Sequence, residues 1–347
     1  MNANALGKRS PVPLRIEIGD QTVRVADPAM KAIFARIDQL ATDRVPVLVT
    51  GETGVGKEII ARALHHRAPW ASGPFIPVNC GGLPTTLIET ELFGHERGAF
   101  TGAVDARPGL VEEASGGTLL LDEIGDLPLE LQPRLLRLLD RRETRRVGST
   151  RSREVDVRVV AATNRDLAAD VAAGRFRLDL FFRLNGSAIV VPPLRERRFD
   201  IPVLAQDLLD AECAIDGRSP MAISPMAMFA LMRHPWPGNV RELKYAMINA
   251  MCTGGAAVEL DHLPASCRGA GPAPTVASPS RTVASGPGLH VAFTPIAEEV
   301  RQLVRSRMLL ALEASHWVVL EAARLLHMPR RTFVARMKQY AIRRPGA

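Results

Sequence analysis

The sequence predicts an α/β fold with a parallel sheet, followed by a small helical subdomain and a separate helical domain at the C-terminus. Three features of the chain carry this prediction. Short apolar runs alternate with helical patterns between residues 45 and 191, strand-like runs are missing between residues 200 and 253, and residues 264–295 are rich in Pro, Gly and Ser. Buried apolar strands that alternate with helices indicate a parallel sheet covered by helices on both faces.

The same features divide the 347 residues into five segments. The first is short and polar, and the fourth has too few large apolar side chains to fold, which is typical of a linker. We expect the following order: a short N-terminal tail at 1–21, an α/β subdomain at 22–198, a helical subdomain at 199–263, a flexible linker at 264–295 and a C-terminal helical domain at 296–347.

The α/β region begins with a helix. Asp27 followed by Pro28 is an N-cap with proline in the first helical position, and apolar residues then recur at helical spacing up to Leu40. Short runs of strand length follow, separated by helical patterns. We expect strands at residues 45–50, 75–78, 118–121, 157–161 and 188–191.

Composition excludes several classes of protein. Hydrophobic residues make up 46% and charged residues 23%, as in ordinary globular proteins. No apolar run approaches the length of about 18 residues that a membrane span needs, and the N-terminus has no signal-peptide pattern. The four cysteines lie far apart without a CxxC pair, which argues against a disulfide scaffold or a zinc ribbon and favours the reducing cytoplasm.

Positive charge is concentrated at the C-terminal end. The chain has a formal net charge of +7, yet residues 264–347 alone hold 12 basic and 4 acidic side chains, a net of +8. A diffuse basic surface would not give this split. It predicts a separate module that binds a polyanion.

A glycine-rich loop follows the first apolar strand and opens a helix. In that context glycines bring backbone N–H groups to phosphate oxygens, the helix N-terminus attracts anions, and a lysine reaches the β and γ phosphates. The alternative is a glycine turn with a chance lysine. The residues of this predicted ATP site are Gly51, Glu52, Thr53, Gly54, Val55, Gly56, Lys57 and Glu58.

Two carboxylates end the strand that begins at residue 118. Asp122 is suited to hold Mg²⁺ and Glu123 to polarise an attacking water, although two solvated acids at a strand end are common by themselves. Their position about 65 residues after Lys57 favours the catalytic interpretation. Asn164 ends the next strand, where its side chain could sense the γ-phosphate.

The segment between these nucleotide motifs resembles the sigma-54-dependent transcriptional activators, or bacterial enhancer-binding proteins, of the AAA+ ATPase superfamily. It reproduces the family's GAFTGA signature without a mismatch. In the family this hexapeptide tips a surface loop that contacts sigma-54. The resemblance implies that role for Gly98, Ala99, Phe100, Thr101, Gly102 and Ala103.

The resemblance also assigns residues elsewhere in the chain. It implies that Asn79 restrains Glu123 until γ-phosphate is bound, and that Arg177 or Arg183 reaches the neighbouring subunit's γ-phosphate. Arg241 lies in a segment similar to the family's sensor II and would contact nucleotide in its own subunit. Glu58 stands where the family usually carries Glu.

Residues 319–342 read as two short helices around a turn at 327–329, with Pro329 near the start of the second. This pattern fits a helix-turn-helix whose second helix enters the major groove, and it resembles the family's Fis-like DNA-binding domain. An earlier helix at 296–315 would complete a three-helix unit. A basic helix without DNA contact is the alternative. The candidate DNA-binding residues are Arg330, Arg331, Thr332, Arg336 and Lys338.

The resemblance implies a cytoplasmic activator that binds upstream double-stranded DNA and uses ATP and Mg²⁺ in a ring, expected to be a hexamer. Its partner would be the sigma-54 RNA polymerase holoenzyme, whose promoter it would open, with no membrane contact. The first 24 residues are too few for the family's receiver domain, so control is expected from a separate regulatory protein, oligomerisation or expression. Two rivals remain: a DNA-binding repressor that keeps the AAA+ fold for oligomerisation, and a general AAA+ remodeller. The intact hexapeptide argues against both.

Overall fold

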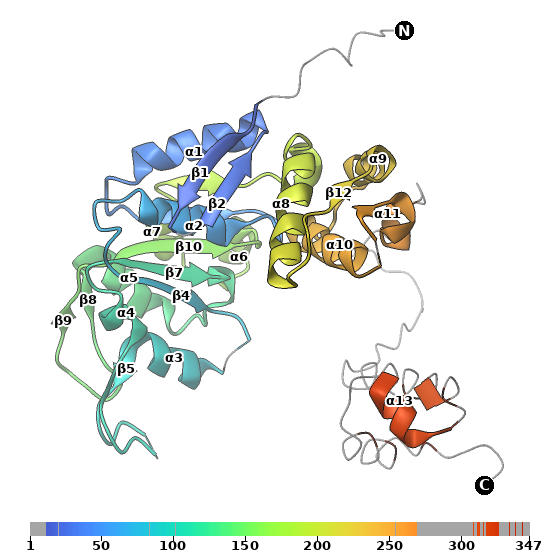
Figure 1. The fold of residues 1–347 in the computed structure, drawn as a ribbon. Coiled ribbons are helices and arrows are strands. Elements are labelled where there is room, and N and C mark those ends of the chain that lie inside the picture. Colours follow the sequence, from blue (N-terminus) through green and yellow to red (C-terminus); the bar gives the residue numbers. More distant parts are fainter. Residues whose placement is uncertain are drawn as a thin grey trace, which may run out of the picture. The chain divides into compact units, whose positions relative to one another are not determined.

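The computed structural model describes residues 12–19, 21–82, 84–100, 102–253 and 255–268. In the C-terminal part it describes residues 308, 311, 312, 315, 317–325, 333, 337 and 342. The chain divides into two compact units, 1–275 and 276–347 (Figure 1). Each is described by itself.

A five-stranded parallel sheet forms the centre of the first unit, which confirms the predicted fold class. Its strand order is β11-β3-β10-β7-β4, so the first strand of the sheet lies inside it between the last two. Each observed strand lies within two residues of its expected position. The strands are β3 (Val47–Thr50), β4 (Phe75–Asn79), β7 (Thr118–Asp122), β10 (Arg158–Thr163) and β11 (Ala188–Val190).

Helices cover both faces of this sheet because successive strand residues point to opposite sides. Val47 and Val49 pack with α1 and α2, whereas Leu48 belongs to the core on the other face. Asp27 caps α1 by accepting a hydrogen bond from the Ala29 N–H, as the sequence predicts. The helices are α1 (Pro28–Leu40) and α2 (Lys57–His66) on one face, and α3 (Thr85–Phe93), α4 (Leu110–Glu113), α5 (Gln132–Arg141), α6 (Leu167–Ala172) and α7 (Leu178–Leu184) around the other core.

An antiparallel hairpin precedes α1, where the sequence analysis expects only a polar tail. It consists of β1 (Leu14–Ile18) and β2 (Gln21–Val25). Ile16, Ile18 and Val25 are buried in the α1–α2 core. Apolar and charged residues alternate in Leu14–Ile18, which is the pattern of a strand with one buried face, so the low apolar content of this segment does not exclude a strand.

Two smaller hairpins project from the same part of the α/β body (Figure 1). One pairs β5 (Gly94–His95) with β6 (Arg107–Pro108), and the other pairs β8 (Glu143–Thr144) with β9 (Arg153–Glu154). A β-bridge between His95 and Val147 joins them. The bridge therefore attaches the β5–β6 hairpin to the loop between β8 and β9.

The helical subdomain has its own apolar core, which includes Trp236. The Trp236 indole N–H donates to the Leu231 carbonyl at 2.8 Å. A two-residue parallel strand pair, β12 (Ala222–Ile223) with β13 (Ala257–Val258), supplements the predicted helices. The helices are α8 (Asp200–Ile215), α9 (Pro225–Arg233), α10 (Asn239–Thr253) and α11 (Ala265–Arg268), with the short 3-10 helices η2 (Leu194–Glu196) and η3 (Leu260–His262).

In the second unit the described helix is α13 (Val319–Leu325), which matches the first predicted helix of the helix-turn-helix. Ala322 and Ala323 pack with Met308, Leu312 and Phe333 in a small buried cluster. No helix among the described residues of either unit is long and apolar enough to cross a bilayer.

Candidate functional site

The glycine loop connects β3 to α2, so its backbone N–H groups lie at a helix N-terminus. Gly54 and Gly56 adopt φ angles of +78° and +101°, which favour glycine. A side-chain carbon added at Gly56 would meet no atom within 4 Å, so the loop leaves an open cradle there. The Lys57 side chain is only 7% exposed, and its Nζ donates to the carbonyls of Gly51 and Glu52 at 3.1 and 3.4 Å. These are the features of a phosphate-binding loop.

The carboxylates at the end of β7 lie beside this loop. Glu123 Oε1 is 3.9 Å from Lys57 Nζ, and Glu123 Oε2 accepts a hydrogen bond from the Asn164 backbone N–H at 3.4 Å. The Asn164 side chain donates to the Thr53 hydroxyl at 2.8 Å. Glu123 itself has a φ of 52°, an uncommon value for a residue other than glycine and one that is concentrated at functional sites. The structure thus gathers Lys57, Glu123 and Asn164 around the loop.

Asn79 ends β4, directly opposite Asp122 in the sheet register. Its side-chain oxygen accepts the Gly81 N–H at 2.8 Å, which leaves it bound within its own turn. The structure therefore places Asn79 one strand away from Glu123 and shows its amide engaged locally.

Asp122 offers carboxylate oxygen, which Mg²⁺ prefers, and one of its oxygens accepts the Glu123 backbone N–H at 3.0 Å. Magnesium is usually held by one or two carboxylates together with substrate phosphates, so a single protein carboxylate beside the phosphate cradle fits the ion. The Glu58 side chain instead makes a contact on the surface of α2. Its carboxylate is exposed and paired with Arg62 at 2.7 Å along α2.

The helical subdomain closes one side of the loop. Arg195 donates two hydrogen bonds to the Glu52 carboxylate, at 2.8 and 2.6 Å, and Asn239 donates to the same carboxylate at 3.1 Å. The pKa of Glu52 is lowered, chiefly by the hydrogen bonds from Arg195. The Val240 N–H donates to the Gly54 carbonyl at 2.9 Å, and exposed Arg241 lies against Gly54. The lid thus contacts the loop at several successive residues.

The two arginines expected to act in trans flank α7, away from the loop. Arg177 is the N-cap residue of α7, and its exposed guanidinium pairs with Asp179 at 2.7 Å. Arg183 lies in the last turn and pairs with Asp140 at 2.9 Å. Among the described residues, neither arginine side chain forms a hydrogen bond or ion pair with the phosphate loop of its own chain.

The hexapeptide lies in the connection between β5 and β6. Phe100 is 45% exposed, and its ring meets the His95 ring edge-on with centroids 5.1 Å apart. The Gly98 N–H donates to the Ala103 carbonyl at 2.9 Å, which closes the loop across its tip. Gly102 has a φ of +103°. Thr101 lies outside the described residues.

Ion pairs brace this connection against the second hairpin. Arg146 donates to both oxygens of Glu112 in α4, at 2.7 and 2.8 Å, and lies 3.5 Å from Glu96. Arg153 lies 3.3 Å from Glu96. A side-chain carbon at Gly148 would come within 2.8 Å of Ala99, so the two connections are in close contact.

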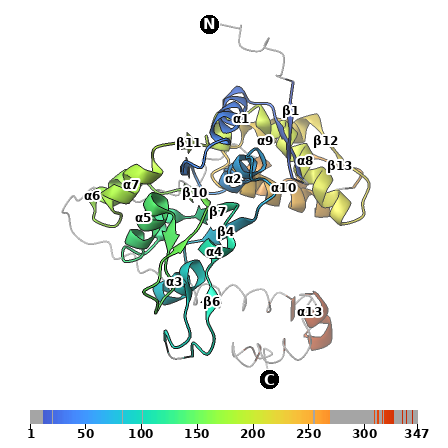
Figure 2. The same cartoon turned by 90° about the vertical axis from the view of Figure 1, so that its left-hand side faces the viewer.

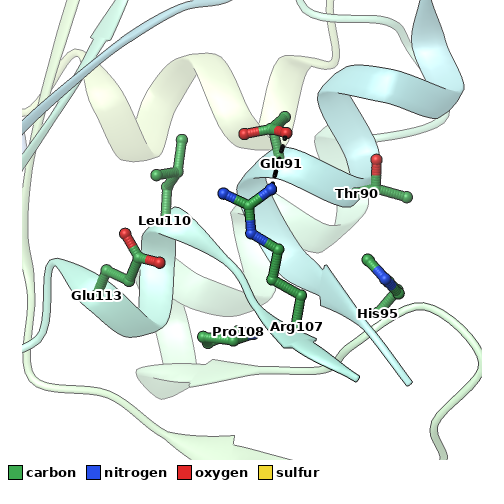
Figure 3. A pocket seen from close by; sticks show the side chains of 7 residues that line it. All are labelled: Thr90, Glu91, His95, Arg107, Pro108, Leu110 and Glu113. Atoms are coloured by element: carbon green, nitrogen blue, oxygen red, sulfur yellow. Dashed lines mark ion pairs between the residues drawn. The ribbon is translucent and has the colours of Figure 1, made fainter. Parts of the chain in front are cut away.

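A small hollow opens at the foot of the β5–β6 hairpin (Figure 3). Arg107 crosses it toward Glu91, with the two charged groups 3.8 Å apart. The cavity volume of this hollow is about 30 Å³, which leaves room for a few water molecules and is too small for a nucleotide. The nucleotide motifs lie elsewhere, at the ends of β3, β7 and β10.

Several residues with close contacts to the site were not identified from the sequence. Arg195 and Asn239 hold the loop from the lid, and Gln132 and Asp170 are buried polar residues near Arg177. For Gln132 a signal existed, since it occupies the apolar stripe of an amphipathic helix. The DNA-binding candidates Arg330, Arg331, Thr332, Arg336 and Lys338 lie outside the described residues.

A parallel sheet in this order, with a phosphate loop, strand-end carboxylates and a helical lid, defines a P-loop nucleotide-binding protein of the AAA+ class. Comparison with protein families agrees along the chain. Residues 23–190 match the family described as "Sigma-54 interaction domain", residues 195–279 the "AAA+ ATPase lid domain", and residues 300–340 the "Bacterial regulatory protein, Fis family".

Individual relatives match over nearly the whole chain. Regulatory protein AtoC of Escherichia coli (strain K12) is 42% identical over 316 residues, which is 91% of this chain and 67% of AtoC. A Nif-specific regulatory protein of Azotobacter vinelandii is 44% identical over 90% of this chain but only 57% of its own length. Among solved structures, NtrX from Brucella abortus in complex with ATP has a TM-score of 0.65 at 30% identity and covers 92% of this chain and 69% of that one. The chain belongs to the family of sigma-54-dependent transcriptional activators, with a Fis-type DNA-binding domain.

Proposed function

We propose that this protein uses ATP hydrolysis in a ring of subunits to remodel the sigma-54 RNA polymerase holoenzyme and open its promoter. The observation that carries the proposal is the intact hexapeptide on an exposed connection of an AAA+ fold, with Phe100 about half exposed at its tip. We propose that this activity is distributed over the five segments expected from the sequence, with the boundaries 21/22, 198/199, 263/264 and 295/296.

ATP would bind at the glycine loop with its phosphates over Gly54 and Gly56. Lys57 would leave its backbone carbonyls for the β and γ phosphates, and Arg241 would contact the nucleotide from the lid. Asp122 would hold Mg²⁺, which when bound neutralises charge on the phosphates. Glu123 would accept a proton from the attacking water, and Asn164 would respond to the γ-phosphate.

A ring of subunits would account for the position of the arginines. Arg177 and Arg183 lie on α7, apart from their own loop, so they would stabilise transition-state charge only in a neighbouring subunit. Such a head-to-tail arrangement would form a ring when the rotation between subunits closes on itself, and the ring is expected to be a hexamer. Asn79 would release its local hydrogen bond to Gly81 and restrain Glu123 when γ-phosphate is absent.

DNA would be bound by the Fis-type domain, through Arg330, Arg331, Thr332, Arg336 and Lys338 on its second helix. Basic side chains there would contact DNA phosphates, and their contribution to the affinity would weaken as the salt concentration rises. Contacts to base edges would give sequence preference. The Pro-rich segment between the domains would then act as a tether.

The test separates the contact loop from hydrolysis. In open-complex assays with sigma-54 holoenzyme, we expect Thr101→Ala to abolish promoter opening while ATP turnover and DNA binding persist. Lys57→Ala should remove both turnover and opening. Thr42→Ala, at an exposed position after α1, is the matched control and should behave as the parent protein. Promoter opening retained by Thr101→Ala would refute the assignment of the loop. Turnover retained by Lys57→Ala would place the phosphate site elsewhere.

A further inference from the structure

We propose that Gln132 is a positioning residue for the arginine that this protein supplies to a neighbouring subunit. The inference rests on the proposed trans role of Arg177. It adds that a buried glutamine, tied to the turn that follows Glu123, fixes the backbone from which Arg177 projects.

Gln132 is the first residue of α5 and is fully buried. Its side-chain amide makes three hydrogen bonds to backbone groups. The amide nitrogen donates to the carbonyls of Leu127 and Arg175, both at 3.1 Å, and the amide oxygen accepts the Arg177 N–H at 2.8 Å. One side chain thus holds the backbone on both sides of Phe176.

This use of Gln132 is informative because a leucine would suit the position for packing alone. Gln132, Leu135, Leu138 and Leu139 are the buried residues of α5. Burying an amide is costly unless its hydrogen bonds are made, and these three are made to groups that no aliphatic side chain could satisfy. The contacts therefore point to a requirement for a fixed backbone at residues 175–177.

A second anchor secures the same segment. The Asp170 carbonyl accepts the N–H groups of Arg175 and Phe176, at 2.9 and 3.3 Å. The Asp170 side chain is 4% exposed and pairs with Arg175 and with Arg165, the residue after Asn164. Phe176 is itself buried. Arg177 thus extends from a rigid base, while its own guanidinium is exposed and paired only on the surface.

Gln132 and the partners of Asp170 also contact the turn that follows Glu123 in the chain's own nucleotide site. Leu127, one of the acceptors of Gln132, ends the short 3-10 helix η1 (Ile124–Asp126), whose N-cap is Glu123. Arg165 pairs with Asp126 of the same turn at 2.7 Å. A shift of η1 in one subunit would therefore move the carbonyl that Gln132 holds, and with it the base of Arg177. Figure 2 shows α5 beside α7, as this path requires.

Steady-state kinetics on the full-length protein distinguish positioning from a packing defect. Gln132→Met keeps the volume but removes the three hydrogen bonds. We expect kcat for ATP to fall on the order of 10- to 100-fold with KM nearly unchanged, since the chain's own binding site is intact. Gln132→Met combined with Arg177→Ala should be no slower than Arg177→Ala alone. Gln206→Met, a lid glutamine that donates to the Met221 carbonyl at 2.9 Å, is the matched control.

Mixed rings give the decisive readout. A Glu123→Gln subunit has a dead site but an intact arginine, whereas a Gln132→Met subunit has an intact site but a misplaced arginine. When the two proteins are mixed in equal amounts, turnover should return at interfaces where a Glu123→Gln subunit supplies its arginine to the site of a Gln132→Met subunit. Random assembly gives this arrangement at about a quarter of all interfaces. A mixture of Glu123→Gln with Arg177→Ala serves as the reference.

The outcomes separate the two ideas. If the reference mixture recovers turnover and the Gln132→Met mixture does not, the role of Gln132 is overturned while the trans role of Arg177 stands. The same conclusion follows if Gln132→Met raises KM or slows the Arg177→Ala protein further. If the reference mixture also fails to recover, the trans arginine of the proposed function is wrong, and the inference falls with it.

Discussion

The Glu52 carboxylate in the phosphate loop and the Arg195 guanidinium in η2, at the junction with the lid, form a two-pronged ion pair, with hydrogen bonds of 2.8 and 2.6 Å across 143 residues of sequence. Paired donors of this kind fix direction as well as distance. Asn239 joins the pair by donating to Glu52 and to the Thr53 carbonyl. The lid is therefore attached to the loop that would hold the nucleotide, and lid movement would alter that loop.

Loss of this attachment should weaken nucleotide binding. We expect Arg195→Ala to raise KM for ATP by about threefold with a smaller change in kcat, because the pair is partly exposed and such pairs contribute about 0.2–1 kcal/mol. A double-mutant cycle with Glu52→Gln should give a coupling energy in that range. Arg233→Ala, on the exposed side of α9, is the control. Additive effects of the two substitutions would show that the pair does not couple lid and loop.

The braced hairpins predict a separation between hydrolysis and promoter opening. Arg146 and Glu112 are 13% and 16% exposed, and the hydrogen bond to Glu112 raises the pKa of Arg146, so this pair is well formed. We expect Arg146→Ala to lower sigma-54-dependent open-complex formation on the order of tenfold while ATP turnover stays within about twofold, since a bonded charge pair is worth roughly 1.5–3 kcal/mol. Exposed Arg151, in the same connection, provides the control Arg151→Ala. Equal losses of both activities would contradict this reading.

Acid stability should depend on Asp170. Burial opposes ionisation of this carboxyl, but the hydrogen bonds from Arg165 and Arg175 outweigh burial and lower its pKa. A carboxyl with a lowered folded pKa stabilises the folded state above its ordinary pKa of 3.8, and the contribution is lost as pH falls through the lower folded value. We therefore expect Asp170→Asn to be less stable at neutral pH and to lose part of the steep acid dependence. Chemical denaturation at pH 7 and at several pH values below 3.8 measures this, and parallel pH profiles for parent and variant would contradict it.

Removal of residues 296–347 should separate DNA binding from ATP turnover. The two units have independent buried clusters, so the remaining chain should keep its fold and its basal ATPase activity. We expect the truncated protein to lose specific DNA binding. Its affinity for the DNA site should be at least about a thousandfold lower than that of the parent protein, whose affinity depends on salt. Gel-shift titrations at two salt concentrations check the result. Specific binding retained by the truncated protein would place DNA recognition in the first unit.

Much of the α/β fold could be predicted because its strands are continuous apolar runs and its helix start at Asp27 follows capping rules. The β1–β2 hairpin is missed when the segment is judged by its polar composition, although the alternation of apolar and charged residues in Leu14–Ile18 has the period of a half-buried strand. The motif residues Lys57, Glu123 and Asn164 follow from local patterns. Gln132 and Arg195 act on segments that are distant in sequence, so only the folded chain reveals their contacts.

The pairing of Arg177 with Asp179 has a thermodynamic consequence. In a separate subunit the guanidinium already has a carboxylate, and this hydrogen bond lowers the pKa of Asp179. A neighbour's triphosphate would have to compete with that carboxylate for the same cation. Because binding linkage is reciprocal, a nucleotide that wins the competition would tighten subunit association, and association would tighten nucleotide binding by an equal factor. Nucleotide loading and ring closure would then be two equilibria coupled by one free energy, which the competition from Asp179 would reduce.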